Sequence, residues 1–116
     1  MNARIIFTSL TIACWATPAF AHAFLKHAEP GAGEALKAPP KRIALTFSEK
    51  LKPGFSSVAV TDVSGRNVEA SALMISGNAM VAPLLPLPPG RYRVTWRAVS
   101  VDAHKTEGAY NFTVQP

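Results

Sequence analysis

Asp102 and His104 are separated by one residue, and in an extended strand this spacing directs both side chains to the same face. A carboxylate and an imidazole side by side are able to bind a metal ion, although two solvated side chains give the same pattern. His22 adds two nitrogens, its α-amine and its imidazole Nδ1, if the chain is cut before it. Three nitrogens and a carboxylate oxygen suit Cu(II), with Zn(II) and Ni(II) as weaker competitors.

The N-terminal residues explain how His22 could become the first residue of the protein. Arg4 precedes an apolar run at 5–15, which is well short of the ~20 residues that a membrane-spanning helix needs. Residues 19–21 read Ala-Phe-Ala, a signal-peptide cleavage site. The sequence therefore predicts a cleaved signal peptide at 1–21 and a secreted domain at 22–116, which would be periplasmic in a Gram-negative bacterium. An uncleaved membrane anchor is the alternative.

The composition of the predicted mature chain limits what it can be. Its 95 residues suffice for one domain with a single hydrophobic core. The only cysteine, Cys14, lies in the signal peptide, so no disulfide is expected. The 11 basic and 7 acidic residues are scattered and do not form a basic patch with stacking aromatics, which argues against nucleic-acid binding. We expect a monomer that does not span the membrane after cleavage.

The elements that must position the candidate ligands are predicted to be short strands. Apolar and polar residues alternate at 43–47, 58–63, 91–99 and 109–114, the period of half-buried strands. Shorter apolar runs at 23–28, 67–68, 72–75 and 79–82 are separated by turn residues, and the proline-rich segment 83–90 excludes a central strand. About seven strands without a sustained helical period predict an all-β fold, an antiparallel β-sandwich or a small Greek-key barrel.

Met74 and Met80 are a second, weaker set of candidate ligands. A loop of residues 76–78 would pair Met74 with Met80 across a hairpin, and two thioethers suit Cu(I). Methionine in an apolar strand more often fills gaps in the core, and two ligands are too few. His27 is a candidate third ligand, or an alternative Cu(II) ligand, but a single histidine in a first strand is more often an exposed side chain.

Several motifs together resemble those of a known family. They are the predicted N-terminal His22, Glu29-Pro30, Phe47-Ser48-Glu49, Val60-Thr61-Asp62 with Gly65, the segment 89–96 (PGRYRVTW), and above all the segment 99–104 (VSVDAH) with Gly108 and Phe112. On these residues the chain from 22 to 114 resembles the CopC-like periplasmic copper-binding proteins of bacterial copper resistance.

The resemblance implies an immunoglobulin-like β-sandwich without enzymatic activity that binds one Cu(II) through His22, Asp102 and His104. It implies a carrier or buffer in copper homeostasis, with an inner-membrane copper transporter as a candidate partner. Glu49 matches a family glutamate, which we expect to orient a ligand; the alternative is a surface carboxylate paired with a neighbouring lysine. Where the family usually has Gly-His-Pro after the aspartate, this chain has Ala103 and Lys105, and this departure is expected to affect copper affinity.

Two other classes of function are compatible with parts of the pattern. Copper-dependent polysaccharide monooxygenases also use an N-terminal histidine on a β-sandwich. Those enzymes are larger proteins, however, and here Asp102 would compete with oxygen for the copper ion. A structural immunoglobulin-like domain would carry its histidines incidentally. Oxidase activity with ascorbate and peroxide distinguishes the first class, and the absence of stoichiometric Cu(II) binding distinguishes the second.

Overall fold

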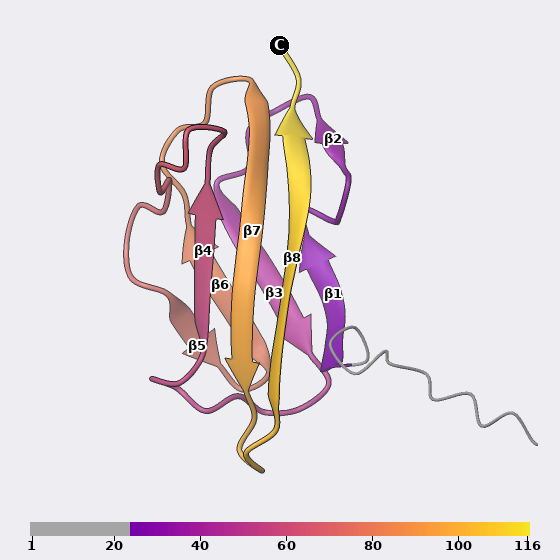
Figure 1. Ribbon diagram of the computed structural model, residues 1–116, viewed down its shortest axis with the longest axis vertical. Helices are drawn as coiled ribbons and strands as arrows, with labels where there is room; N and C mark the ends of the chain where they lie inside the picture. The colour runs from indigo at the N-terminus through magenta and orange to yellow at the C-terminus, as the bar shows by residue number, and fades with distance from the viewer. Residues whose placement is uncertain (1–23) are drawn as a thin grey trace, which may run out of the picture.

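The chain folds as two four-stranded sheets packed face to face, seen in a computed structural model that describes residues 24–116 (Figure 1). The predicted signal peptide and His22 lie outside the described residues. The first sheet has the order β1-β3-β6-β5 and the second β2-β8-β7-β4. The strands are β1 (Leu25–Glu29), β2 (Ala35–Leu36), β3 (Arg42–Phe47), β4 (Ser57–Thr61), β5 (Met74–Ser76), β6 (Ala79–Pro83), β7 (Gly90–Val99) and β8 (Lys105–Val114).

This architecture confirms the predicted all-β sandwich. All pairings are antiparallel except that of the two-residue β2, which runs parallel to β8 and which the sequence pattern did not predict. The expected strand at 67–68 is reduced to one isolated bridge, between Thr61 and Asn67. Within residues 24–116, no helix is long and apolar enough to cross a membrane.

The core lies between the two sheets and follows from the alternation of apolar residues. Along β7, Val94 and Trp96 are buried, while Thr95 between them is exposed. Leu45 and Phe47 of β3 face them, and the Phe47 and Trp96 rings meet edge to face at 5.3 Å. Each fully buried large apolar side chain contributes about 1.5–3 kcal/mol to stability. This core holds β3 and β7 against each other across the two sheets.

Trp96 also determines which residue can lie opposite it. Its register partner on β8 is Gly108, and the indole lies against the glycine backbone. A Cβ atom at Gly108 would be 2.5 Å from Cζ2 of Trp96, closer than non-bonded atoms can approach. The glycine therefore makes room for the indole and lets β8 pair with β7 along its full length.

The β5–β6 hairpin differs from its prediction by one residue. Met74 pairs with Val81 and Ser76 with Ala79, so the loop contains only Gly77 and Asn78. The predicted pairing of Met74 with Met80 was therefore wrong, because Ser76 belongs to the strand. A shift of one residue exchanges the two faces of a strand. Met80 is fully buried in the core, whereas the side chain of Met74 is exposed on the outer face.

Candidate metal centre

Two loops meet at the end of the sandwich where β3 and β7 finish (Figure 1). One loop follows β3, and the other, residues 100–104, connects β7 to β8. Val101 N of the second loop donates to Lys50 O of the first at 3.0 Å, and Lys52 N donates to the carbonyl of Val99, the last residue of β7, at 2.7 Å. Because these bonds continue the strand pairing beyond the sheets, the side chains on the two loops are held at defined positions.

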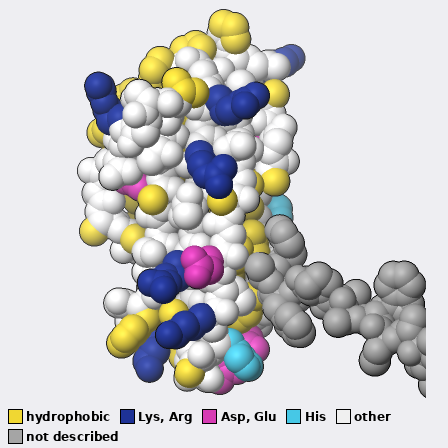
Figure 2. Space-filling view, in the orientation of Figure 1, with side chains coloured by type: hydrophobic (Ala, Val, Ile, Leu, Met, Phe, Trp, Pro, Cys, Tyr) yellow, Lys and Arg dark blue, Asp and Glu magenta, His cyan; other side chains and the backbone are white. Residues whose placement is uncertain are grey.

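Glu49, Asp102 and His104 come together where the two loops touch. One ligand atom from each residue lies within 4.8 Å of those of the other two, a grouping that could hold a metal ion. The closest pair is Asp102 Oδ2 and His104 Nδ1, at 3.0 Å. All three are accessible, and Figure 2 shows a histidine beside acidic side chains at this end of the molecule. Carboxylate oxygens and an imidazole nitrogen are donors that suit Cu(II) and Zn(II).

Glu49 is as close to the other two residues as a direct ligand would be. The sequence indicated either an outer partner of a ligand or a surface carboxylate paired with a lysine. Among the ion pairs between described residues, none joins Glu49 to a lysine. Its position next to Asp102 and His104 therefore favours a role at the metal centre.

Asp102 and His104 lie in a tight turn, so the prediction that both extend along a strand was wrong. The turn is closed by hydrogen bonds from Ala103 N to Ser100 O and from Ser100 N to His104 O, both 2.9 Å long. Ala103 has φ of 69°, in the left-handed region that favours glycine. The two candidate ligand side chains meet because the chain folds back at Ala103, and the alternation of a strand is not the cause.

Ser100 is a part of this centre that sequence reasoning missed. Its side chain is fully buried, and its hydroxyl donates to Asp102 Oδ1 and accepts a hydrogen bond from His104 N at 3.2 Å. The available signal was a hydroxyl residue two positions before an aspartate, a spacing at which serine readily bonds to its neighbours in a turn.

The hydrogen bond from the Ser100 hydroxyl is the main cause that holds the pKa of Asp102 below its usual value, and the Glu49 side chain and His104 act in the same direction. A hydrogen bond to a carboxylate favours its charged form. Asp102 is therefore an anion at neutral pH. Metal ligands must be deprotonated to bind, so the turn keeps this carboxylate ready for a cation.

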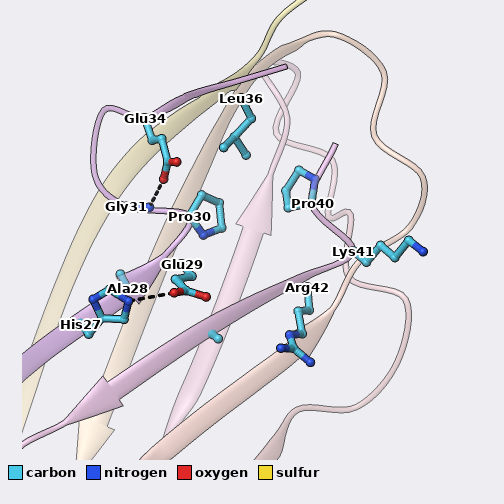
Figure 3. Close-up of a pocket in the computed structure, with 11 residues that line it drawn as sticks. His27, Ala28, Glu29, Pro30, Gly31, Glu34, Leu36, Pro40, Lys41 and Arg42 are labelled. Carbon is cyan, nitrogen blue, oxygen red and sulfur yellow. Dashed lines mark hydrogen bonds and ion pairs between the residues drawn. The ribbon is translucent and has the colours of Figure 1, made fainter. Parts of the chain in front are cut away.

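His27 lies outside this cluster, on β1. Its Nε2 is 3.0 Å from Glu29 Oε1, and both residues line a cavity of about 830 Å³ at the edge of the sandwich (Figure 3). His27 also cannot share a metal with Met74, because β1 and β5 are the opposite edges of one sheet. Three strand spacings separate them, about 14 Å. The structure thus excludes a joint site of His27 with the two methionines.

The first described residues of the chain lie beside the candidate centre. The amide of Ser48 donates to the carbonyl of Phe24 at 2.8 Å, and Leu25 pairs with Phe47. Phe24 is itself buried in the core. The start of the described chain is therefore anchored next to the segment that carries Glu49.

The sequence model of the CopC domain family matches residues 25–115 of the chain. The protein YobA of Escherichia coli K12 is 36% identical over 116 residues, which cover 97% of this chain and 94% of YobA. Copper resistance protein C of Escherichia coli is 37% identical over 122 residues, which cover 97% and 96% of the two chains.

Solved structures agree with these matches. The crystal structure of CopC from Methylosinus trichosporium OB3b has a TM-score of 0.74 and 33% identity, and the match covers 82% of this chain and 95% of that one. PcoC, a methionine-rich copper resistance protein from Escherichia coli, has a TM-score of 0.69 and 40% identity, and the match covers 79% and 97%. The resemblance found in the sequence is thereby confirmed.

Proposed function

This chain belongs to the CopC family of copper resistance proteins, and from that premise we propose that it binds one Cu(II) in the periplasm as a carrier or buffer. The cluster of Glu49, Asp102 and His104 is the observation that carries the proposal, because it gathers metal-binding side chains from two separate loops. A copper-binding role in resistance follows from the family. The oxidation state, the ligand set and the carrier role are the parts that we propose.

We propose that Asp102 and His104 bind the ion together with His22, once a signal peptide of residues 1–21 has been removed. The position of Phe24 supports this ligand set. A chain advances at most about 3.5 Å per residue, so the two residue steps from Phe24 back to His22 span at most about 7 Å. Phe24 is hydrogen-bonded to Ser48, the neighbour of Glu49. An α-amine and imidazole at position 22 are therefore within reach of the cluster.

The proposed oxidation state is Cu(II), because the donors at the centre are oxygen and nitrogen. Cu(I) prefers thioethers, and this chain places Met74 and Met80 on opposite faces of the β5–β6 hairpin, with Met80 fully buried. The two sulfur atoms therefore have no common metal site in the described structure. PcoC, by contrast, is described as methionine-rich.

A copper carrier must release its ion to another protein, and the exposure of the cluster favours such a transfer. The side chains of Asp102 and His104 are 49% and 72% exposed, so another protein's ligands can approach the ion directly. We propose that the domain acts as a monomer that exchanges copper with an inner-membrane transporter. A copper-dependent monooxygenase is the competing function, and ascorbate-driven oxidase activity of the loaded protein would favour it.

One added residue tests the ligand set. The form that begins at His22 is compared with a form that carries an extra alanine before it, which converts the α-amine into a poorly donating amide. We expect the extension to weaken Cu(II) binding by more than the roughly 10–100-fold that the loss of an outer partner costs. Competition titration measures the affinity, and electron paramagnetic resonance (EPR) reports the donor atoms. The unextended form, titrated also with Cu(I), is the control and should bind Cu(I) weakly.

Unchanged affinity and an unchanged resonance spectrum in the extended form would mean that the N-terminus is not a ligand. The centre would then consist of Glu49, Asp102 and His104 alone. Absence of Cu(II) binding by the form that begins at His22 would contradict the proposed function itself.

A further inference from the structure

The turn that carries Asp102 and His104 is built around the buried hydroxyl of Ser100, which the proposed ligand set does not use. We propose that Ser100 is a positioning residue: it occupies Oδ1 of Asp102, so that copper binds this carboxylate through Oδ2 alone. The inference rests on the proposed function, since it concerns how the same centre receives its ion. It assigns to Ser100 a role in the geometry of binding in addition to its role in the fold.

The hydrogen bonds of Ser100 leave one carboxylate oxygen for the metal. A serine hydroxyl has one proton to donate, and Asp102 Oδ1 is closer to the Ser100 oxygen than the alternative acceptor, the His104 carbonyl oxygen at 3.5 Å, so the proton goes to Asp102. The lone pairs of the same oxygen accept the His104 amide at 3.2 Å. The other carboxylate oxygen, Oδ2, faces His104 Nδ1 at 3.0 Å. An ion that inserts between Oδ2 and Nδ1 therefore meets one oxygen and one nitrogen that already converge.

Burial makes this arrangement rigid. Ser100 has no exposed surface, so water does not replace its hydroxyl as the partner of Asp102. Its backbone bonds to Ala103 and His104 close the turn, and its bridge to Leu51 fixes the turn against the loop that carries Glu49. Ligands held in place before the metal arrives avoid the entropy cost of ordering them on binding. Through these contacts, Ser100 fixes the positions of Asp102, His104 and the loop that carries Glu49 relative to one another.

The chain contains a matched control for this role. Ser56 is also buried, and its hydroxyl also accepts a backbone hydrogen bond, from Val99 N at 3.0 Å. Val99 is the last residue of β7 and directly precedes Ser100, but the Ser56 hydroxyl forms its hydrogen bonds with the backbone of Lys52 and Val99 and with no candidate ligand. Ser56→Ala and Ser100→Ala each remove one buried hydroxyl near the same loops, and only Ser100→Ala releases Asp102.

The first test compares Cu(II) affinity and the EPR spectrum in the two variants. Ser100→Ala is expected to weaken binding about 10–100-fold, as losses of an outer partner of a ligand typically do, and to change the spectrum. Ser56→Ala is expected to keep the wild-type spectrum and an affinity within about three-fold of the wild type. In the metal-free proteins, the His104 amide is expected to exchange with solvent faster in Ser100→Ala than in Ser56→Ala.

The second test needs no change at Ser100 and therefore does not depend on how that variant folds. Asp62 and Asp102 are the only aspartates of the chain, so carboxyl-labelled aspartate in Asp62→Asn reports on Asp102 alone. Binding through one oxygen widens the separation between the two carboxylate stretching bands in the infrared. We expect this widening when Cu(II) is added.

Three results would overturn the inference. They are a narrow, bidentate band separation in the labelled protein, an unchanged spectrum and affinity in Ser100→Ala, and equal losses in Ser56→Ala and Ser100→Ala, which would show a structural role only. Each of these presupposes that the wild type binds Cu(II). A wild type that binds none would overturn the proposed function and, with it, the role of Ser100.

Discussion

Ala103 adopts a backbone conformation that its side chain disfavours, in the turn between the two candidate ligands. At φ of 69° a Cβ atom crowds the following carbonyl, which costs about 1–2 kcal/mol. The turn keeps this conformation because Ser100 and His104 bond across it. The strain is thus located where the chain must fold back to bring Asp102 to His104.

Replacing Ala103 with glycine is expected to stabilise the protein. The relief of the Cβ contact outweighs the greater freedom of glycine in the unfolded chain, which costs about 0.4–1 kcal/mol. The net gain in the free energy of unfolding is expected to be about 0.5–1 kcal/mol, measured by denaturant titration. Ala109→Gly on β8, where no such strain is present, is the control and should destabilise. A loss of stability in Ala103→Gly would show that the turn is not strained.

The residues of the centre were only partly predictable. Asp102 and His104 could be identified from their types and spacing, but the reason for their proximity could not, because a turn and a strand both bring positions i and i+2 together. Glu49 was identified through the family pattern rather than through its contacts, since it lies more than 50 positions from Asp102. Ser100 was missed because its burial is decided by tertiary packing.

At the scale of elements, the alternation of apolar and polar residues predicted β3 and β7 closely, β8 only from residue 109 onward, and the short strands poorly. β3, β7 and β8 alternate clearly, since one face of each packs on the core. β2 has only two residues, too few to show any period. The β5–β6 loop was misjudged by one residue, because both Ser76 and Gly77 are common in turns and only the sheet register distinguishes them.

The contact between β7 and β8 gives a prediction at this scale. Gly108→Ala would place a Cβ atom against the Trp96 indole, which is itself held by Phe47. We expect a loss of about 1–3 kcal/mol in the free energy of unfolding, the usual cost of overpacking, measured by denaturant titration.

Gly31→Ala is the matched control for that substitution. The Cβ atom at Gly31 would have its nearest neighbours at 3.7 Å, an ordinary contact, and Gly31 is not among the glycines with positive φ. The free energy of unfolding of Gly31→Ala should therefore differ little from that of the wild type. Equal effects at Gly31 and Gly108 would indicate a general cost of removing glycine and would contradict a specific role for the Trp96 contact.

In the molecule as a whole, the residues that stabilise the fold and the candidate metal ligands lie in different regions. The core lies between the sheets, and the centre lies on two loops at one end, next to the start of β1 (Figure 1). No local pattern in the sequence could show that these three segments meet, because their meeting depends on the packing of both sheets. The loops are joined by backbone hydrogen bonds that involve no side chain of the candidate ligands.

The metal-free protein is therefore expected to be folded, and copper is expected to add stability only by mass action. Free Cu(II) at 100 times the dissociation constant adds about 2.7 kcal/mol. For a domain of this size, about 1 kcal/mol corresponds to roughly 4–8 °C, so the unfolding midpoint should rise by roughly 10–20 °C. Calorimetry with copper and then with a chelator measures the unfolding midpoints of the copper-loaded and metal-free protein.

The variant His104→Ala is the control. Without metal, its unfolding midpoint should match that of the wild type, and with copper it should lose most of the rise, since the His104 ring contacts only the exposed cluster. A chelated wild type without a cooperative transition would show that copper is part of the fold, and the exposed centre would then have to be a structural site.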